Sequence, residues 1–75
     1  MTLKELVMCM YYGQQIRVFE CDYFDRTKKT LIMDGTNHNL RSTIYSDFAN
    51  RKVIGFGVGE VENTIDINVE EKEPV

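Results

Sequence analysis

Three glycines alternate with apolar residues in Gly55-Phe56-Gly57-Val58-Gly59, the most unusual stretch of the sequence. G-x-G-x-G resembles the phosphate-binding loop of dinucleotide sites, but that loop needs a strand before its glycines and a helix after them. Here the glycines lie inside a strand-like run, and a second strand-like run follows. We therefore interpret the stretch as a strand with a bare strip of backbone, which is typical of a bulge, a sharp twist or a close approach by another element.

The element that covers this strip is either another part of the chain or a partner chain. With Ile54, Phe56 and Val58 facing the core, the three glycines lie on the opposite face of the strand. Self-association would add buried apolar area that so short a chain lacks. We expect a homodimer with Gly57 at or near the contact. The candidate interface residues are Gly55, Gly57 and Gly59.

Cys9, Cys21 and His38 are the only soft metal ligands in the sequence. No pair has the close C-x-x-C or H-x-x-x-H spacing that makes a zinc site recognisable. One cysteine lies in a helix-like segment and the other in a strand-like one, where small buried thiols are common. We expect both cysteines to be structural, with no metal and no cofactor.

Asp22, Asp25 and Asp34 fall near one predicted hairpin, where they would form a cation site or an acid/base pair if they gathered. They do not match the calcium loop D-x-[DN]-x-[DN]-G, and aspartate is common in turns. The chain has a single histidine and no G-x-S-x-G motif, so nucleophilic catalysis has no support. We predict that the protein is not an enzyme and that these aspartates form turns or face solvent.

The charge balance argues against general nucleic-acid binding, because the formal net charge is −3 and a phosphate backbone needs a basic surface. Arg26, Lys28 and Lys29 form a short basic cluster, interpreted as a solvated turn or a contact for an acidic partner. A nucleic-acid-associated regulator remains the alternative function. It would use Arg17, Arg26, Lys28, Lys29, Arg41, Arg51 and Lys52.

The chain of 75 residues, 43% hydrophobic and 28% charged, has the balance of one small globular domain spanning residues 1–75. Lys4 and Glu5 interrupt any apolar segment of a signal peptide. No run approaches the ~20 apolar residues of a membrane-spanning helix. We expect a soluble cytoplasmic protein with free thiols.

The first half of the chain predicts a helix followed by a β-hairpin. The helix spans Thr2 to Met10, with Thr2 and Glu5 in the positions of a capping box. The first strand runs from about Gln14 to Phe24, and the return strand is Thr30–Asp34. In the first strand, alternation places Ile16 and Val18 on one face and Arg17, Phe19, Cys21 and Tyr23 on the other.

The second half predicts a short helix and two more strands. Within residues 35–52, Leu40, Ile44 and Phe48 are spaced as a buried helical stripe. The cap of that helix is Asn37, Asn39 or Ser42. The strands are Val53–Val58 and Thr64–Val69, the second alternating cleanly with Ile65, Ile67 and Val69 on one face. The acidic residues 70–75 are expected to form a frayed tail.

These elements give the order α-β-β-α-β-β. The predicted fold is a small α+β domain with a mainly antiparallel four-stranded sheet and the N-terminal helix on one face. The second form of this prediction is a sheet that curls towards a small barrel.

The layout resembles a loose group of small uncharacterised proteins encoded by phages and prophages of Gram-positive bacteria. The resemblance covers nearly the whole chain, although the three glycines near residue 57 are not part of the shared pattern. It implies a mobile-element origin and a bacterial cytoplasm, and it carries over no functional residues. The expected function is a non-catalytic protein-interaction or accessory module. The shared positions are Leu3, Leu6, Ile16, Arg17, Val18, Gly35, Thr36, Leu40, Arg41, Val53, Ile54, Ile65, Ile67 and Val69.

Overall fold

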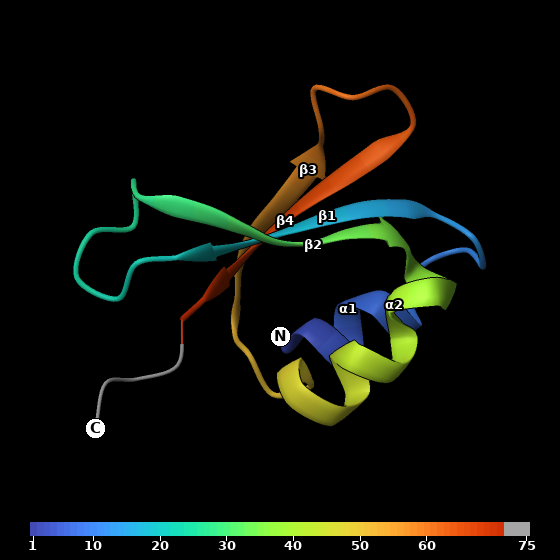
Figure 1. Cartoon of the computed structure of the whole chain (residues 1–75), viewed down its shortest axis with the longest axis horizontal. Coiled ribbons are helices and arrows are strands. Elements are labelled where there is room, and N and C mark those ends of the chain that lie inside the picture. The colour runs from blue at the N-terminus through green and yellow to red at the C-terminus, as the bar shows by residue number, and fades with distance from the viewer. Residues whose placement is uncertain (72–75) are drawn as a thin grey trace.

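The computed structural model describes residues 1–71 and contains one four-stranded sheet with a helical layer (Figure 1). No helix in this part of the chain combines the length and apolar character that crossing a membrane requires. The elements in chain order are α1 (Leu3–Met8), β1 (Gln15–Cys21), β2 (Lys29–Thr36), α2 (Asn37–Thr43), the π-helical turn η1 (Ile44–Phe48), β3 (Val53–Val58) and β4 (Thr64–Glu70).

The sheet is mixed, with strand order β2-β1-β4-β3. Each hairpin, β1–β2 and β3–β4, is antiparallel, but the hairpins meet through a parallel β1–β4 pair at the centre. The prediction of a mainly antiparallel sheet is therefore wrong. The barrel variant is wrong as well, because β2 and β3 are the two edges of an open sheet. Strand alternation reports which face is buried, not the direction of the neighbouring strand, so the pattern did not reveal the parallel pair.

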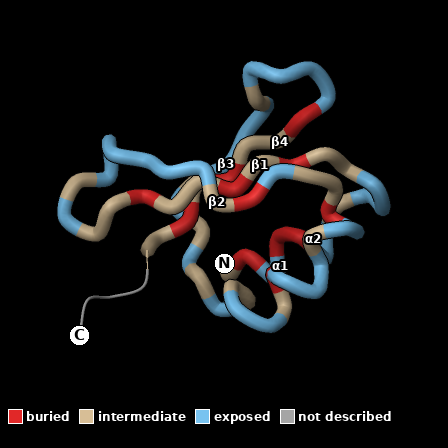
Figure 2. Tube along the Cα trace, in the orientation of Figure 1, coloured by how far each residue is buried: buried red, intermediate tan, exposed pale blue. Residues whose placement is uncertain are grey.

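Both helical segments cover the same face of the sheet (Figure 1). The core lies between them and the central strands, as the facing buried segments in Figure 2 show. The predicted inward face of β4 is confirmed, because Ile67 and Val69 are fully buried. In β1 the face that carries Ile16 and Val18 is the buried one. The other buried hydrophobic residues of this core are Leu3, Leu6, Val7, Met33 and Ile44.

The second helical region is two consecutive segments, α2 and η1, rather than one short helix. Ile44 of the predicted stripe is fully buried, and Leu40 and Phe48 pack against the core. The cap is Thr36, whose hydroxyl accepts a hydrogen bond from the amide of Asn39. None of the three predicted capping residues fills this role.

Asn37 is instead buried and ties the α1–β1 connection to the start of α2. Its Oδ1 accepts from the amide of Gly13 at 2.8 Å, and its Nδ2 donates to the carbonyl of Tyr11 at 2.7 Å. Gly13 has φ +84°, the left-handed conformation that glycine tolerates. It lies in the turn before β1, whereas α1 has already ended at Met8, two residues before the predicted end.

β1 ends at Cys21, three residues earlier than predicted, because Asp22 starts a turn. Its Oδ1 accepts hydrogen bonds from the amides of Phe24 and Asp25, a local geometry that competes with the strand. At the other end of the sheet, Glu70 belongs to β4 and the amide of Glu71 donates to the Cys21 carbonyl. These two residues are therefore not a frayed tail, and the rest of the predicted tail, residues 72–75, lies outside the described residues.

The predicted capping box of α1 is confirmed and gives the first test. The Thr2 hydroxyl accepts from the amide of Glu5, and the Glu5 carboxylate accepts from the amide of Thr2 at 2.8 Å. Thr2→Ala should lower the free energy of unfolding by about 0.5–2 kcal/mol, measured by urea denaturation. Thr43→Ala is the control, because the Thr43 side chain makes no capping bond. Equal effects of the two substitutions would contradict this role of Thr2.

Candidate functional site

The outer edge of β3 is only partly covered by the chain itself. The N-terminal residues pair with the start of β3 through an antiparallel bridge between Thr2 and Lys52. The Val53 amide donates to the Met1 carbonyl, and the Leu3 amide donates to the Arg51 carbonyl, both at 2.9 Å. Beyond this bridge, no strand of the described chain pairs with the outer side of residues 54–58.

Phe56 and Val58 point their main-chain groups out of this edge. The Gly59 amide donates to the Thr64 carbonyl at 2.8 Å, so Gly59 and Thr64 form the hydrogen-bonded pair that closes the hairpin turn. Antiparallel pairs alternate between hydrogen-bonded and non-hydrogen-bonded positions. Gly57 and Gly55 therefore bond to β4, whereas the N–H and C=O groups of Val58 and Phe56 face outwards. An outward row of this kind is a template for another strand.

The prediction that Ile54, Phe56 and Val58 pack into the core is wrong. Phe56 lies opposite the buried Ile67, so it is on the helix side of the sheet. Its exposed fraction is nevertheless 57%, and that of Val58 is 92%. The β3–β4 turn is directed away from the helices (Figure 1), and the far half of β3 is exposed (Figure 2). The helical layer is too short to cover this end of the strand.

The glycine strip on the other face of β3 divides into two kinds of position. A Cβ at Gly55 or Gly57 would have no atom of the described chain within 4 Å. No element within residues 1–71 covers these two glycines, so the interpretation of an intramolecular cover fails for them in this part of the chain. A Cβ at Gly59 would stand 2.5 Å from Oδ1 of Asp66. Of the three features considered for the strip, a bulge is present, as a register shift between Val53 and Gly55.

Asp66 is held in place by a bidentate ion pair with Arg17 across the central strands. Nε and Nη2 of Arg17 donate to its two carboxylate oxygens at 2.9 and 2.8 Å. This bonding lowers the pKa of Asp66 and raises that of Arg17. The Arg17 guanidinium also lies 5.1 Å from the ring centre of Phe19, on the sheet face without helices. The ion pair keeps the Asp66 carboxylate beside Gly59.

Ion pairs also engage three of the seven basic residues considered for nucleic-acid binding. Besides Arg17, Arg26 donates to Glu70 at 2.8 Å and Arg51 donates to Glu20. A guanidinium paired with a carboxylate has less charge to offer a phosphate. Three of the seven residues therefore have their charge engaged within the described chain.

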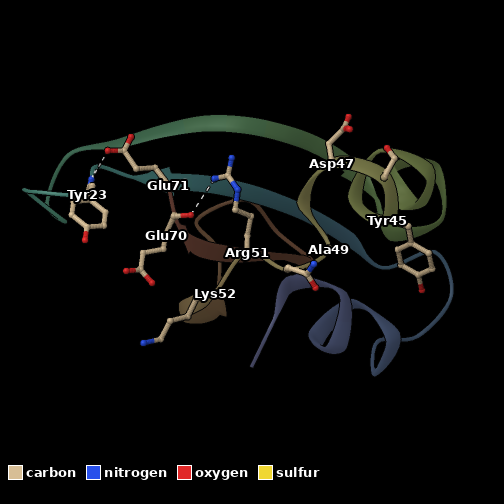
Figure 3. A pocket seen from close by; sticks show the side chains of 10 residues that line it. Tyr23, Tyr45, Asp47, Ala49, Arg51, Lys52, Glu70 and Glu71 are labelled. Carbon is tan, nitrogen blue, oxygen red and sulfur yellow. Dashed lines mark hydrogen bonds between the residues drawn. The ribbon is translucent and has the colours of Figure 1, made fainter. Parts of the chain in front are cut away.

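A hollow of about 550 Å³ lies where η1, the start of β3 and the end of β4 meet (Figure 3). Nη1 of Arg51 reaches the Glu70 carbonyl at 3.1 Å as well as the Glu20 carboxylate. The Glu71 carboxylate accepts from the amide of Tyr23 at 2.7 Å. Because these charged groups already serve internal contacts, we interpret the hollow as a joint between the helical layer and the sheet.

A smaller groove of about 260 Å³ lies between α1 and α2. The Lys4 ammonium and the Arg41 guanidinium each lie 5.1 Å from the centre of the Tyr45 ring. The rings of Tyr12 and His38 lie 4.5 Å apart. Sequence reasoning missed this cluster because the residues come from three separate segments with no shared spacing.

The residues that suggested metal or acid/base chemistry are dispersed. Cys9 is exposed and Cys21 is buried, and both are free thiols. Among residues 1–71, no three histidine, cysteine or acidic side chains are placed to hold a metal ion. Asp25 bonds to Thr27 within the turn, which lowers its pKa. Asp34 accepts from Nε2 of Gln15 at 3.1 Å.

Comparisons with protein-family models, with curated proteins and with solved structures found no match. The open edge of β3 is the strongest candidate site because it combines unpaired main-chain groups with exposed apolar side chains.

The two kinds of glycine position should respond differently to alanine. Gly55→Ala and Gly57→Ala should leave stability unchanged or raise it by up to about 1 kcal/mol, because glycine weakens a strand. Gly59→Ala should lower it by about 1–3 kcal/mol, the usual effect of overpacking, since Arg17 holds the carboxylate that the new methyl would meet. Urea denaturation measures all three, and equal effects at the three positions would contradict this division.

The Arg17–Asp66 pair should make stability depend on acidic pH. Because the pKa of Asp66 is lower in the folded state than its value of about 3.9 in an unfolded chain, ionised Asp66 adds stability above that pH. The contribution is lost as pH falls through the lower folded-state pKa. Asp66→Asn should therefore be less stable than wild type at pH 7, with the difference closing in acid. Arg17→Gln should weaken the same pH dependence, and parallel stability curves from pH 7 to acid would refute the assignment.

Proposed function

We propose that this protein is a non-catalytic interaction or accessory module of phage or prophage origin, acting in the bacterial cytoplasm. A strand of the partner protein pairs with the outer edge of β3 and so extends the sheet. Main-chain hydrogen bonds provide affinity in this mode, and side chains on alternate positions provide selectivity. The observation that carries the proposal is the outward main-chain row at Phe56 and Val58, with both side chains exposed.

The exposed edge is unusual for a soluble protein. Natural edge strands are normally protected by charged side chains, proline or a covering loop. Residues 53–58 contain no charge and no proline. Among the described residues, only Met1 and Thr2 cover this edge, at the start of the strand. The bulge beside Ile54 is the one protective feature of the strand itself. An edge left open in this way is suited to receiving a partner.

The other candidate functions have weaker support. Three of the seven basic residues that a nucleic-acid regulator would use are already engaged in internal ion pairs. For an enzyme, the aspartates considered serve turns and strand contacts instead of converging on a cavity. We therefore place the function on the strand edge rather than in either hollow.

Val58→Pro is the variant that tests strand addition. Proline removes the N–H that points out of the sheet, while Val58 gives no N–H bond to β4 for it to disrupt. Val58→Thr is the matched control, because it keeps this N–H and a similar shape at an exposed position.

Immobilised wild-type protein and Val58→Thr should retain a bacterial partner from a lysate of the host, and Val58→Pro should lose it. Circular dichroism and thermal melting should show that all three proteins are folded. Retention of the same proteins by all three would exclude the β3 edge as the binding surface.

A further inference from the structure

We propose that the strand received by β3 is β3 of a second copy of this chain, paired antiparallel so that two sheets join into one. This inference rests on the proposed function, because it names the partner of the same edge. A two-fold symmetric contact uses one surface twice, so that surface must complement itself.

The chemistry of β3 makes it complementary to its own copy. Residues 53–58 carry no charge, so two copies can approach along the strand without local repulsion despite the net charge of −3 on each chain. Antiparallel pairing places the same face of both β3 strands on the same side of the joined sheet. Phe56 and Val58 of both copies come together on the helix side, and glycines meet glycines on the other.

The charges at the two ends of the strand select the antiparallel direction. Lys52 precedes β3, whereas Glu60 and Glu62 follow it, and all three are exposed. In an antiparallel pair, the end of β3 that carries Lys52 in each copy faces the end that carries Glu60 and Glu62 in the other. Opposite charges then attract at both ends of the contact, outside the edge that Met1 and Thr2 cover. A parallel pair would place like charges side by side. Opposite charges across an interface fix its orientation and register.

The free part of the edge sets the size of the contact. Met1 and Thr2 cover the edge up to Val53, so pairing is confined to Ile54–Val58. The outward groups of Phe56 and Val58 then exchange hydrogen bonds with the second copy, and their exposed side chains become covered. A contact of this length is small, and small interfaces form weak, concentration-dependent complexes.

A charge-swap experiment tests partner and direction together. Lys52→Glu gives one variant, and the double substitution Glu60→Lys with Glu62→Lys gives the other. Each variant alone should dimerise more weakly than wild type, because both end contacts become repulsive. An equimolar mixture should regain dimer, since every end contact in the mixed pair is attractive again. Sedimentation equilibrium of tag-free protein over a concentration series measures these dissociation constants.

Val58→Pro should raise the dissociation constant at least about tenfold, and Val58→Thr should change it by no more than about threefold. High salt should weaken the wild-type dimer and reduce the advantage of the mixed pair. Thermal melting checks that each variant is folded.

Three outcomes overturn the inference. The first is a wild type that remains monomeric at millimolar concentration. The second is a dimer that Val58→Pro leaves intact, and the third is a mixture that dimerises no better than its components. If the wild type is monomeric but captures another protein in a manner sensitive to Val58→Pro, the proposed function stands and only the identity of the partner is wrong. If neither dimerisation nor capture responds to Val58→Pro, both proposals fail.

Discussion

The parallel pairing of β1 with β4 is the constraint on which the rest of the structure depends. Two local hairpins cannot join in this way unless the chain crosses from one edge of the sheet to the other, between β2 and β3. The segment that makes this crossing is α2 with η1, and it passes over the same face that α1 covers (Figure 1). The core is therefore enclosed by the crossing itself. The same route leaves β3 as an edge strand rather than a central one.

Arg51 secures the end of this crossing. It lies between η1 and β3, with its guanidinium 5.0 Å from the ring centre of Phe48 and bonded to the Glu20 carboxylate. Glu20 follows Ile16 and Val18 on the face of β1 that points towards the helices. A carboxylate placed there needs a partner, because a partly buried charge without one is costly. One arginine thus satisfies that charge and fixes where the helical layer returns to the sheet.

Local signals in the sequence predicted most of the elements but not how they are arranged. The capping box at Thr2 and the alternation of Ile67 with Val69 were sufficient to place a helix and an inward face. Strand direction was not predictable, because alternation is identical in parallel and antiparallel neighbours. The capping role of Thr36 was missed since the residue also ends a strand.

The sequence pattern directed attention to the glycines of β3, whereas the structure directs it to the open edge of the same strand. A bulge was one of three interpretations of these glycines, and it lies beside Ile54. The side chains of Phe56 and Val58 were assigned to the core because an apolar alternating strand is normally buried on one face. Their exposure depends on how far the helical layer extends, which is a property of the whole fold. The six residues of β3 alone do not indicate how far the helical layer extends.

The short pairing of Met1 and Thr2 with β3 has a practical consequence for handling the protein. Because this pairing is antiparallel, with Thr2 opposite Lys52 and the Met1 carbonyl bonded to the Val53 amide, residues placed ahead of Met1 head towards Val58. A peptide fused to this end has the direction of a partner strand and starts in register with the open edge. Such a fusion becomes a tethered competitor at high effective concentration. Purification tags therefore belong at the other end of the chain.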